Sequence, residues 1–339
     1  MRRGRLDHAA ADHRRRRSRR RPHHPHRRPT GACLVSHPIR TAVLGLGRAS
    51  AAVYVPAFQA HQRYDLLAVA SSRPGRAAEI ATARKVPHIY DNWREVISDP
   101  RIELVVVASA HAGRAEQVRE ALANRRHVLT EVPFCGNREE ASSVLEAARK
   151  GGGVAAAAFP LRYLPAHQAL RELIANNHLG SARFAALRQV SGAWHRAAAV
   201  HAVDTLCWTL GAVTGEVQRL EGEQQAILQV RHDGGCASQL AVEGRGATED
   251  YAFSVSGTER MAMVVGERPA NGELHVIEGD RDDEYALRPS PYQRFAAAHR
   301  LVPPLMELLD DLALAIDGKA SAVPTLAGAA DAMEATAWA

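Results

Sequence analysis

Residues 39–50 read as a short apolar strand, a turn with two glycines and the start of an alanine-rich helix. This order constrains the fold, because a strand that enters such a turn aims the free N–H groups and the positive dipole end of the helix at a ligand. Gly45 permits the tight turn, and Gly47 leaves no side chain between the backbone and a pyrophosphate. Ser50 replaces the usual third glycine with a small residue. The segment therefore predicts a dinucleotide site.

Strand-like and helix-like segments alternate after this turn. The predicted strands are 66–70, 102–108, 127–130 and 154–158, and the predicted helices are 74–84, 114–124 and 138–149. Short apolar runs that alternate with helices are typical of a parallel, doubly wound sheet, in which ligands bind at the carboxyl ends of the strands. We therefore predict a dinucleotide-binding α/β domain over residues 37–158.

The end of the second predicted strand should read the adenosine ribose of the cofactor. A site for NAD prefers an acidic residue there, which accepts a hydrogen bond from the 2′-hydroxyl. This chain has Ser71, Ser72 and Arg73 instead, and hydroxyls with a guanidinium suit a 2′-phosphate. The sequence therefore favours NADP over NAD, although Arg73 is equally explained as a solvated residue at a helix start.

The second half of the chain predicts a different architecture. A helix is predicted over 165–177, strands over 182–190, 226–230, 237–242, 251–255, 261–265 and 274–277, a helix over 198–210 and a leucine-rich core helix over 303–317. Turn signals at 233–235 and 271–272 indicate hairpin connections. We expect an α+β domain over residues 159–339 with a mainly antiparallel sheet. One solvated face of that sheet suits subunit pairing, so a homodimer or homotetramer is expected.

The basic charge of the chain is confined to its first residues. Residues 1–36 hold twelve arginines and two aspartates, a net of +10, so the other 303 residues carry −4 of the total of +6. This segment has almost nothing to bury and is expected to be disordered. Three interpretations stay open: translation that begins near Leu34 or Val35, a solvated tail, or a nucleic-acid-binding arm. The acidic remainder argues against nucleic acid as a partner.

Four scattered cysteines without CxxC spacing suggest reduced thiols in a cytoplasmic protein rather than a disulfide framework. No metal-ligand constellation stands out, so no metal site is expected. No apolar run approaches the ~20 residues that a membrane span requires, and we expect no membrane association.

Several motifs together make the chain resemble a known family. They are 45–49 (GLGRA), 56–58 (PAF), 67–73 (LAVASSR), 121–133 (ALANRRHVLTEVP), 159–165 (FPLRYLP), 201–204 (HAVD) and 295–300 (FAAAHR). Their order from Ile39 to the C-terminus resembles the Gfo/Idh/MocA oxidoreductases, the glucose–fructose oxidoreductase and inositol dehydrogenase superfamily.

The resemblance implies a Rossmann domain that binds a nicotinamide cofactor, followed by an α+β domain whose open, mainly antiparallel sheet forms the substrate wall. It implies hydride transfer between NAD or NADP and a sugar, polyol or related hydroxyl compound. The residues predicted to bind the cofactor are Gly45, Gly47, Arg48, Ala49, Ser71, Ser72, Arg73, Glu131 and Pro133.

The chain departs from the family pattern at the reacting end. Where the family has Glu-Lys-Pro, whose lysine bonds the reacting hydroxyl, this sequence has Glu131, Val132 and Pro133. The aspartate that usually stands four residues before the active-site histidine is Ala197 here. These departures support a second hypothesis, a catalytically impaired relative that binds a dinucleotide or a sugar-like ligand.

The remaining catalytic candidates are His201, Asp204, Arg162 and Tyr163. Histidine suits removal of a hydroxyl proton, since its ordinary pKa of ~6.5 lies near working pH. Asp204 shares a helix face with His201 and either orients the imidazole or pairs structurally. Arg162 and Tyr163 either reach the cleft or support packing and salt bridges. His111 and His195 are further candidates to replace the missing lysine.

Overall fold

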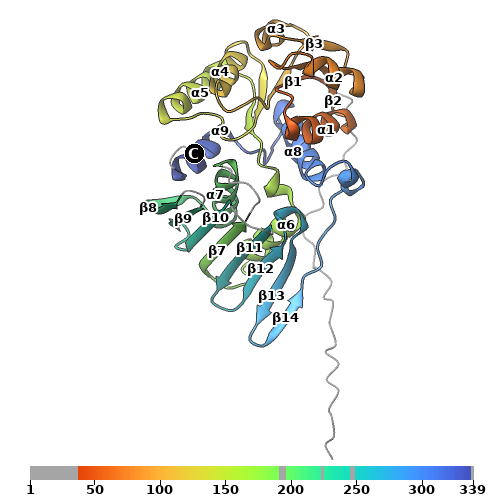
Figure 1. The fold of residues 1–339 in the computed structure, drawn as a ribbon. Coiled ribbons are helices and arrows are strands. Elements are labelled where there is room, and N and C mark those ends of the chain that lie inside the picture. The colour runs from red at the N-terminus through yellow and green to blue at the C-terminus, as the bar shows by residue number, and fades with distance from the viewer. Residues whose placement is uncertain (1–36, 191–195, 223–224, 245–248, 337–339) are drawn as a thin grey trace, which may run out of the picture.

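The computed structural model describes residues 37–190, 196–222, 225–244 and 249–336. The expected leader, residues 1–36, and His195 lie outside this part of the chain. Figure 1 shows two sheets, one above the other, with helices packed against each. Across the described ranges, no helix has both the length and the apolar character that a membrane span needs.

The upper sheet contains six strands, and every neighbouring pair is parallel. In spatial order they are β3 (His88–Tyr90), β2 (Tyr64–Ala70), β1 (Ile39–Leu44), β4 (Leu104–Val107), β5 (His127–Thr130) and β6 (Ala155–Ala157). This order confirms the predicted doubly wound Rossmann sheet. Strands β2 and β3 are added on one side of β1 and strands β4 to β6 on the other, so the strand order reverses between β1 and β4. Sheets of this kind bind ligands outside that switch point.

Helices cover both faces of this sheet because its strands are apolar on both sides (Figure 1). One face packs against α3 (Trp93–Ser98), α4 (Arg114–Ala123) and α5 (Arg138–Gly151), and the other against α1 (Val55–Ala60) and α2 (Arg76–Arg84). The sequence marks the ends of α5 clearly. The Asn137 side chain caps its first turn by accepting from the N–H of Glu140, and Gly152 ends it with φ of 72°.

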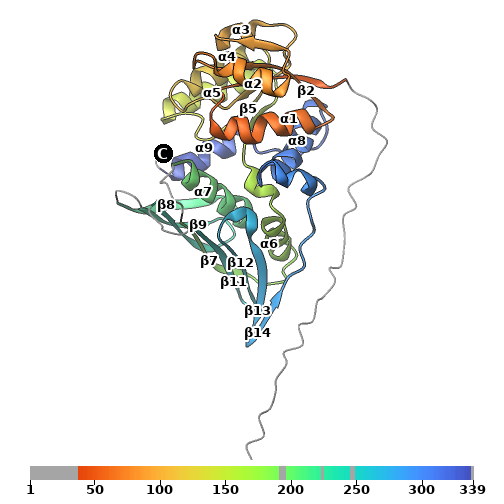
Figure 2. The same cartoon turned by 45° about the vertical axis from the view of Figure 1, so that its right-hand side comes forward.

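The lower sheet contains eight strands and is antiparallel except where β7 and β10 pair in parallel, which confirms the predicted mainly antiparallel sheet. In chain order they are β7 (Ala182–Val190), β8 (Val213–Gly222), β9 (Gln225–His232), β10 (Ala237–Glu243), β11 (Asp250–Gly257), β12 (Met261–Gly266), β13 (Glu273–Glu278) and β14 (Arg281–Glu284). Helices α6 (Pro165–Ala175) and α7 (Arg196–Leu210) pack against one face (Figure 2).

The C-terminal segment returns to the upper sheet. Four leucines of α8 (Val302–Ile316), at 305, 308, 309 and 312, are fully buried, as predicted, in the same apolar cluster as Phe58 of α1. The backbone N–H of Ala157 in β6 donates to the carbonyl of Pro324 at 2.9 Å. The last helix, α9 (Leu326–Ala335), packs against α5 and α7. The upper sheet and its helices are therefore completed by residues from the C-terminal segment, 302–335.

Candidate dinucleotide site and its surroundings

Gly45 ends β1 in a conformation that requires glycine. Its φ is +85°, and a Cβ built there would lie 2.3 Å from the Cα of Ser109. Its N–H donates to the carbonyl of Ala70 at 2.9 Å. The turn is thus fixed between the ends of three neighbouring strands, β2, β1 and β4, as the sequence predicted for a tight turn.

Gly47 leaves open space in front of the helix that follows. Apart from its two chain neighbours, no described residue has an atom within 4 Å of a Cβ built at this position. The helix begins at Arg48, and Ser50 opens a π-helical turn that runs to Tyr54. The Ser50 hydroxyl is buried, and among the described residues it has no hydrogen-bond partner. Open space, a helix N-terminus and an orphan hydroxyl together fit the pyrophosphate of a dinucleotide.

The residues predicted to face the adenosine ribose lie at the end of β2. Ser71 is buried and its Oγ accepts from the N–H of Arg73 at 3.2 Å, while Ser72 and Arg73 are exposed. Arg76, which sequence analysis missed, donates from Nε to the carbonyl of Leu46 in the glycine turn at 3.1 Å. The signal that could have found Arg76 is its place at the first residue of the helix after β2.

Glu131 follows β5, on the far side of the switch point from the ribose end. Its carboxyl group is a hydrogen-bond partner of the Tyr54 phenol, which lies in the π-helical turn. Burial raises the pKa of Glu131, whereas the hydrogen bond from Tyr54 and the positive charge of Arg114 oppose that rise. The sequence motif indicated Glu131 as a cofactor-binding residue, but neither Tyr54 nor Arg114 was predicted as its partner.

Arg114, the first residue of α4, ties the ends of β4 and β5 together. It donates to the carbonyl of Pro133 and to the carbonyl of Ser109, both at 2.5 Å. It is buried, and burial lowers the pKa of its guanidinium. Pro133 follows a cis peptide bond after Val132, whose side chain is 2% exposed and belongs to the large apolar cluster.

His201 lies on α7 beside the end of β6. Its ring meets Phe159 edge-on, with 5.4 Å between the ring centroids. Its Nδ1 is buried, and no hydrogen-bond partner for this atom lies in the described residues. Burial lowers the pKa of His201 to about 4. The imidazole is therefore neutral at pH 7, and its unpartnered Nδ1 leaves one ring nitrogen without a contact among the described residues.

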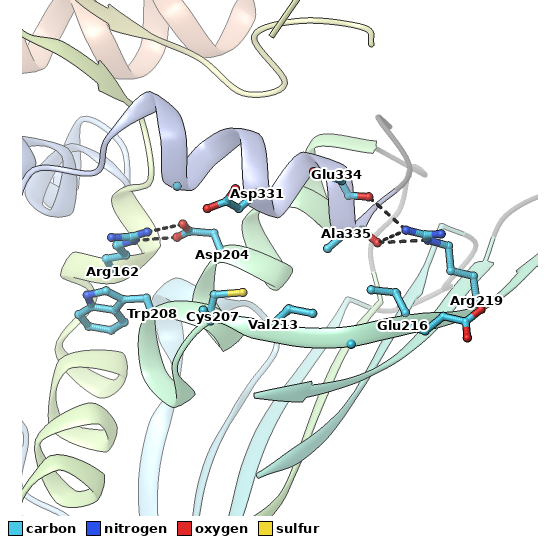
Figure 3. A pocket seen from close by; sticks show the side chains of 14 residues that line it. Arg162, Asp204, Cys207, Trp208, Val213, Glu216, Arg219, Asp331, Glu334 and Ala335 are labelled. Atoms are coloured by element: carbon cyan, nitrogen blue, oxygen red, sulfur yellow. Dashed lines mark hydrogen bonds and ion pairs between the residues drawn. The ribbon is translucent and has the colours of Figure 1, made fainter. Parts of the chain in front are cut away.

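Asp204 is paired with Arg162 rather than with His201. Nε of Arg162 donates to Oδ2 of Asp204 at 2.8 Å and Nη2 donates to Oδ1 at 2.5 Å, which makes the contact bidentate (Figure 3). The Asp204 side chain is 2% exposed and that of Arg162 is 18% exposed. Of the two roles left open for Asp204, the geometry supports structural pairing, because both carboxylate oxygens are occupied by the guanidinium.

This ion pair forms one wall of a cavity of about 580 Å³ (Figure 3). The cavity is lined by Arg162, Asp204, Cys207, Trp208, Ala212, Val213, Gly215, Glu216, Val217, Arg219, Gly328, Asp331, Glu334 and Ala335. They come from α7, β8, α9 and the 3-10 turn Pro160–Tyr163 before α6. Glu131, Val132 and His201 are not among them. The cavity is therefore separate from the group of residues at the end of β5.

Tyr163 points toward α8. It is 5% exposed, and its hydroxyl donates to Oδ2 of Asp311 at 2.8 Å. This placement supports the packing alternative for Tyr163. His111, by contrast, lies near the candidate site, where its Nε2 lies 3.0 Å from the carbonyl of Cys135. In the part of the chain that the structure describes, no three His, Cys, Asp or Glu side chains gather as metal ligands would.

Comparison with known proteins supports the prediction of an oxidoreductase. An uncharacterised oxidoreductase of Synechocystis sp. is 30% identical over 142 residues, which make up 42% of this chain and 38% of that protein. The chain thus spans well under half the length of this relative. A trans-1,2-dihydrobenzene-1,2-diol dehydrogenase of Macaca fascicularis is 27% identical over 248 residues, which make up 67% of this chain and 74% of the relative.

Among solved structures, levoglucosan dehydrogenase in complex with NADH and levoglucosan superposes with a TM-score of 0.76. The identity is 17%, and the match covers 89% of this chain and 96% of that one, so it shows a shared fold. The family model described as "Oxidoreductase family, NAD-binding Rossmann fold" matches residues 39–159. This match to the first part of the chain is to the same family, the Gfo/Idh/MocA oxidoreductases, that the sequence motifs resemble.

Proposed function

We propose that this protein is an NAD(P)-dependent oxidoreductase that transfers a hydride between the cofactor and a sugar, polyol or related hydroxyl compound. The observation that carries the proposal is the Gly45–Gly47 turn at the switch point of a sheet whose sequence matches an NAD-binding family. The activities named for two similar proteins, a dihydrodiol dehydrogenase and levoglucosan dehydrogenase, support a hydroxyl-bearing substrate.

The bound nicotinamide would supply the hydride acceptor, and His201 would accept the hydroxyl proton. Its imidazole is neutral at pH 7, because burial lowers its pKa, and the same shift makes it a weaker base than an exposed histidine. Phe159 holds the ring by an edge-to-face contact. The other predicted catalytic residues, Arg162, Asp204 and Tyr163, would have a structural role. Arg162 pairs with Asp204, and the Tyr163 hydroxyl donates to Asp311.

A second candidate function is that of an impaired relative, which binds its ligand with little or no turnover. Val132 favours it, because a buried apolar side chain cannot stabilise a developing alkoxide. Loss of such a donor typically costs ~10²–10³-fold in rate. Ala197, half-buried one turn before His201 on α7, likewise offers no carboxylate.

Fluorescence titration of the full chain with NADPH and NADH, followed by a panel of sugars, polyols and dihydrodiols, separates these functions. Binding with turnover supports the oxidoreductase. Binding without turnover on any of the compounds supports the impaired relative. Absence of binding by both cofactors contradicts the assignment of Gly45 and Gly47 to a dinucleotide site.

Val132→Lys tests whether the departure at Val132 accounts for slow chemistry. If it marks lost catalysis, the lysine should raise turnover on polyols. Because Val132 is buried among apolar side chains, some loss of stability should accompany the change. An unchanged rate, together with loss of activity in His201→Ala, would mean that other residues fill the role.

We further propose a preference for NADP, supported by the exposed Arg73 beside the hydroxyls of Ser71 and Ser72. A hydrogen bond from a cationic side chain contributes about 1.5–3 kcal/mol. Arg73→Ala should therefore raise the Kd for NADPH about tenfold or more, while the Kd for NADH changes little. Equal changes for the two cofactors would contradict the assignment of Arg73 to the 2′-phosphate.

We also propose that copies of the chain pair through the open face of the lower sheet, which gives a homodimer or homotetramer. Phe184 on β7 is 45% exposed there. Its neighbours in register are Ala237 on β10 and Ser256 on β11, which leave a flat surface. Phe184→Glu should lower the mass measured by light scattering.

A cytoplasmic location is supported by the free thiols of Cys135, Cys207 and Cys236.

A further inference from the structure

The ends of β4 and β5 carry a cluster of charged and phenolic side chains that the proposed hydride transfer does not yet use. Resting on the proposed function, we propose that Glu131, held by Tyr54 and backed by Arg114, makes the site prefer the oxidised over the reduced nicotinamide cofactor. Glu131 supplies a negative charge beside the nicotinamide ring. Tyr54 and Arg114 position that charge.

The topology places Glu131 at the nicotinamide end of the cofactor. The glycine turn after β1 takes the pyrophosphate, and the residues after β2 take the adenosine ribose. The other half of an extended dinucleotide must then lie across the ends of the strands on the opposite side of the switch point, β4 and β5. Glu131 follows β5 directly, and it is half-buried rather than enclosed.

Among the described residues, no ion pair cancels the charge of Glu131. Its carboxyl group has the Tyr54 phenol and the N–H of Val132 as hydrogen-bond partners. Arg114 acts on it only through space, because the two terminal nitrogens of Arg114 donate to the carbonyls of Ser109 and Pro133. Arg114 is also the more deeply buried of the two, with 7% of its surface exposed.

The charge of the nicotinamide ring differs between the two states of the cofactor. The oxidised ring is a cation and the reduced ring is neutral, so a nearby carboxylate in a poorly solvated site stabilises the oxidised form selectively. The hydrogen bond from Tyr54 favours the ionised form of the carboxyl group, against the burial that raises its pKa, and fixes its position. Tyr54 lies in a π-helical turn, a feature frequent at functional sites.

The test is the ratio of two dissociation constants, measured on the full chain by titration with NADP+ and NADPH, and likewise with NAD+ and NADH. Glu131→Gln should lower the preference for the oxidised form about tenfold, since it removes a charge but keeps the shape. Tyr54→Phe should lower the preference less, about threefold, because the carboxylate remains but loses one partner.

Tyr64→Phe is the matched control. Tyr64 is another buried tyrosine, 6% exposed, and its hydroxyl donates to the carbonyl of Leu309 in α8 at 2.7 Å, away from the glycine turn. It should leave the ratio unchanged. A merely structural role for Glu131 would weaken both cofactor forms equally and leave the ratio intact.

The outcomes separate the two proposals. An unchanged ratio in Glu131→Gln, with both forms still bound, overturns this inference and leaves the proposed function standing. A wild-type protein that binds neither form overturns the proposed function, and this inference with it. If one variant fails to fold, the other decides, because each is expected to change the ratio in the same direction.

Discussion

Two carboxylates in neighbouring regions of this protein, the buried Asp204 and the half-buried Glu131, have opposite kinds of partner. Asp204 receives two hydrogen bonds from one guanidinium, so its charge is neutralised within the pair. Glu131 is hydrogen-bonded to a phenol and a backbone N–H, and the guanidinium of Arg114, which acts on it through space, donates to two carbonyls. The difference separates a carboxylate that holds the fold from one whose charge is left to act on a ligand.

The same contrast extends to the groups around them. Tyr163, like Asp204, is paired with another residue of the protein, because its hydroxyl donates to Asp311. His201, like Glu131, has a polar group available to a ligand, since its Nδ1 has no partner among the described residues. Each prediction below breaks one closed contact or removes one open group.

The largest effect on stability is expected for Asp204→Asn. This variant leaves the largely buried guanidinium of Arg162 without its carboxylate. Removal of one partner of a buried pair typically lowers the free energy of unfolding by about 3–5 kcal/mol, which urea unfolding would measure. The double variant Arg162→Met with Asp204→Leu should recover much of the loss, because it leaves no buried charge.

The double variant also tests the catalytic role that the sequence predicted for both residues. If it folds and turns over normally, the pair is structural. A folded double variant without activity would contradict the contrast drawn above and place Arg162 and Asp204 in the reaction.

His201→Ala should lower kcat about 10²-fold or more, because it removes the expected general base. The change should leave cofactor affinity close to that of the wild type. His167 provides a control, since it is also a buried histidine but both of its nitrogens have partners, the carbonyl of Leu161 and the hydroxyl of Tyr251. His167→Gln should therefore lower stability and spare kcat. Equal kcat values for His201→Ala and the wild type would exclude His201 as the base.

The pH dependence of stability should report the same two histidines. Burial lowers the pKa of both His201 and His167 to about 4, below the ordinary value of 6.5. Between these values the unfolded chain binds more protons than the folded one, so the free energy of unfolding should fall as pH drops from about 6.5 to 4. His201→Ala should make this fall shallower in urea titrations at several pH values. An unchanged slope would mean that His201 is not buried as a neutral ring.

Tyr163→Phe should have the smallest effect. It removes one hydrogen bond to a carboxylate, which contributes about 1.5–3 kcal/mol at most to stability. Its kcat should stay within about twofold of the wild-type value. A loss of tenfold or more in a variant with normal thermal unfolding would restore the predicted catalytic role of Tyr163.

The sequence predicted most of the fold because the decisive strands are continuous apolar runs. It missed β3, α3, β8, β14 and α9 for the converse reason. Residues 281–284 in β14 are all charged, and 326–335 in α9 are dominated by alanine, so neither segment shows the apolar period that marks a strand or helix. Pairing with a neighbouring strand or packing on α5 and α7 determines their structure instead.

The candidate site was predictable only where local geometry determines it. The glycine turn is such a case, because the positive φ of Gly45 is a conformation that glycine adopts readily and other residues rarely adopt. The partners of the polar residues were not predictable, since they come from distant parts of the chain. The spacing of His201 and Asp204 indicated a shared helix face, yet the residue that approaches Asp204 is Arg162, before α6. Tyr54 and Arg114 became visible only when the fold brought them to Glu131.

The return of the C-terminal segment to the upper sheet has a consequence for how the chain is made. While the ribosome is still adding the last residues, the apolar surface of α1 that α8 covers has no partner, and the edge of β6 lacks its bond to Pro324. The N-terminal unit cannot be completed as it emerges, although domains generally fold in the order of synthesis. Nascent chains of this protein should therefore expose this apolar surface until residues 302–324 have emerged from the ribosome.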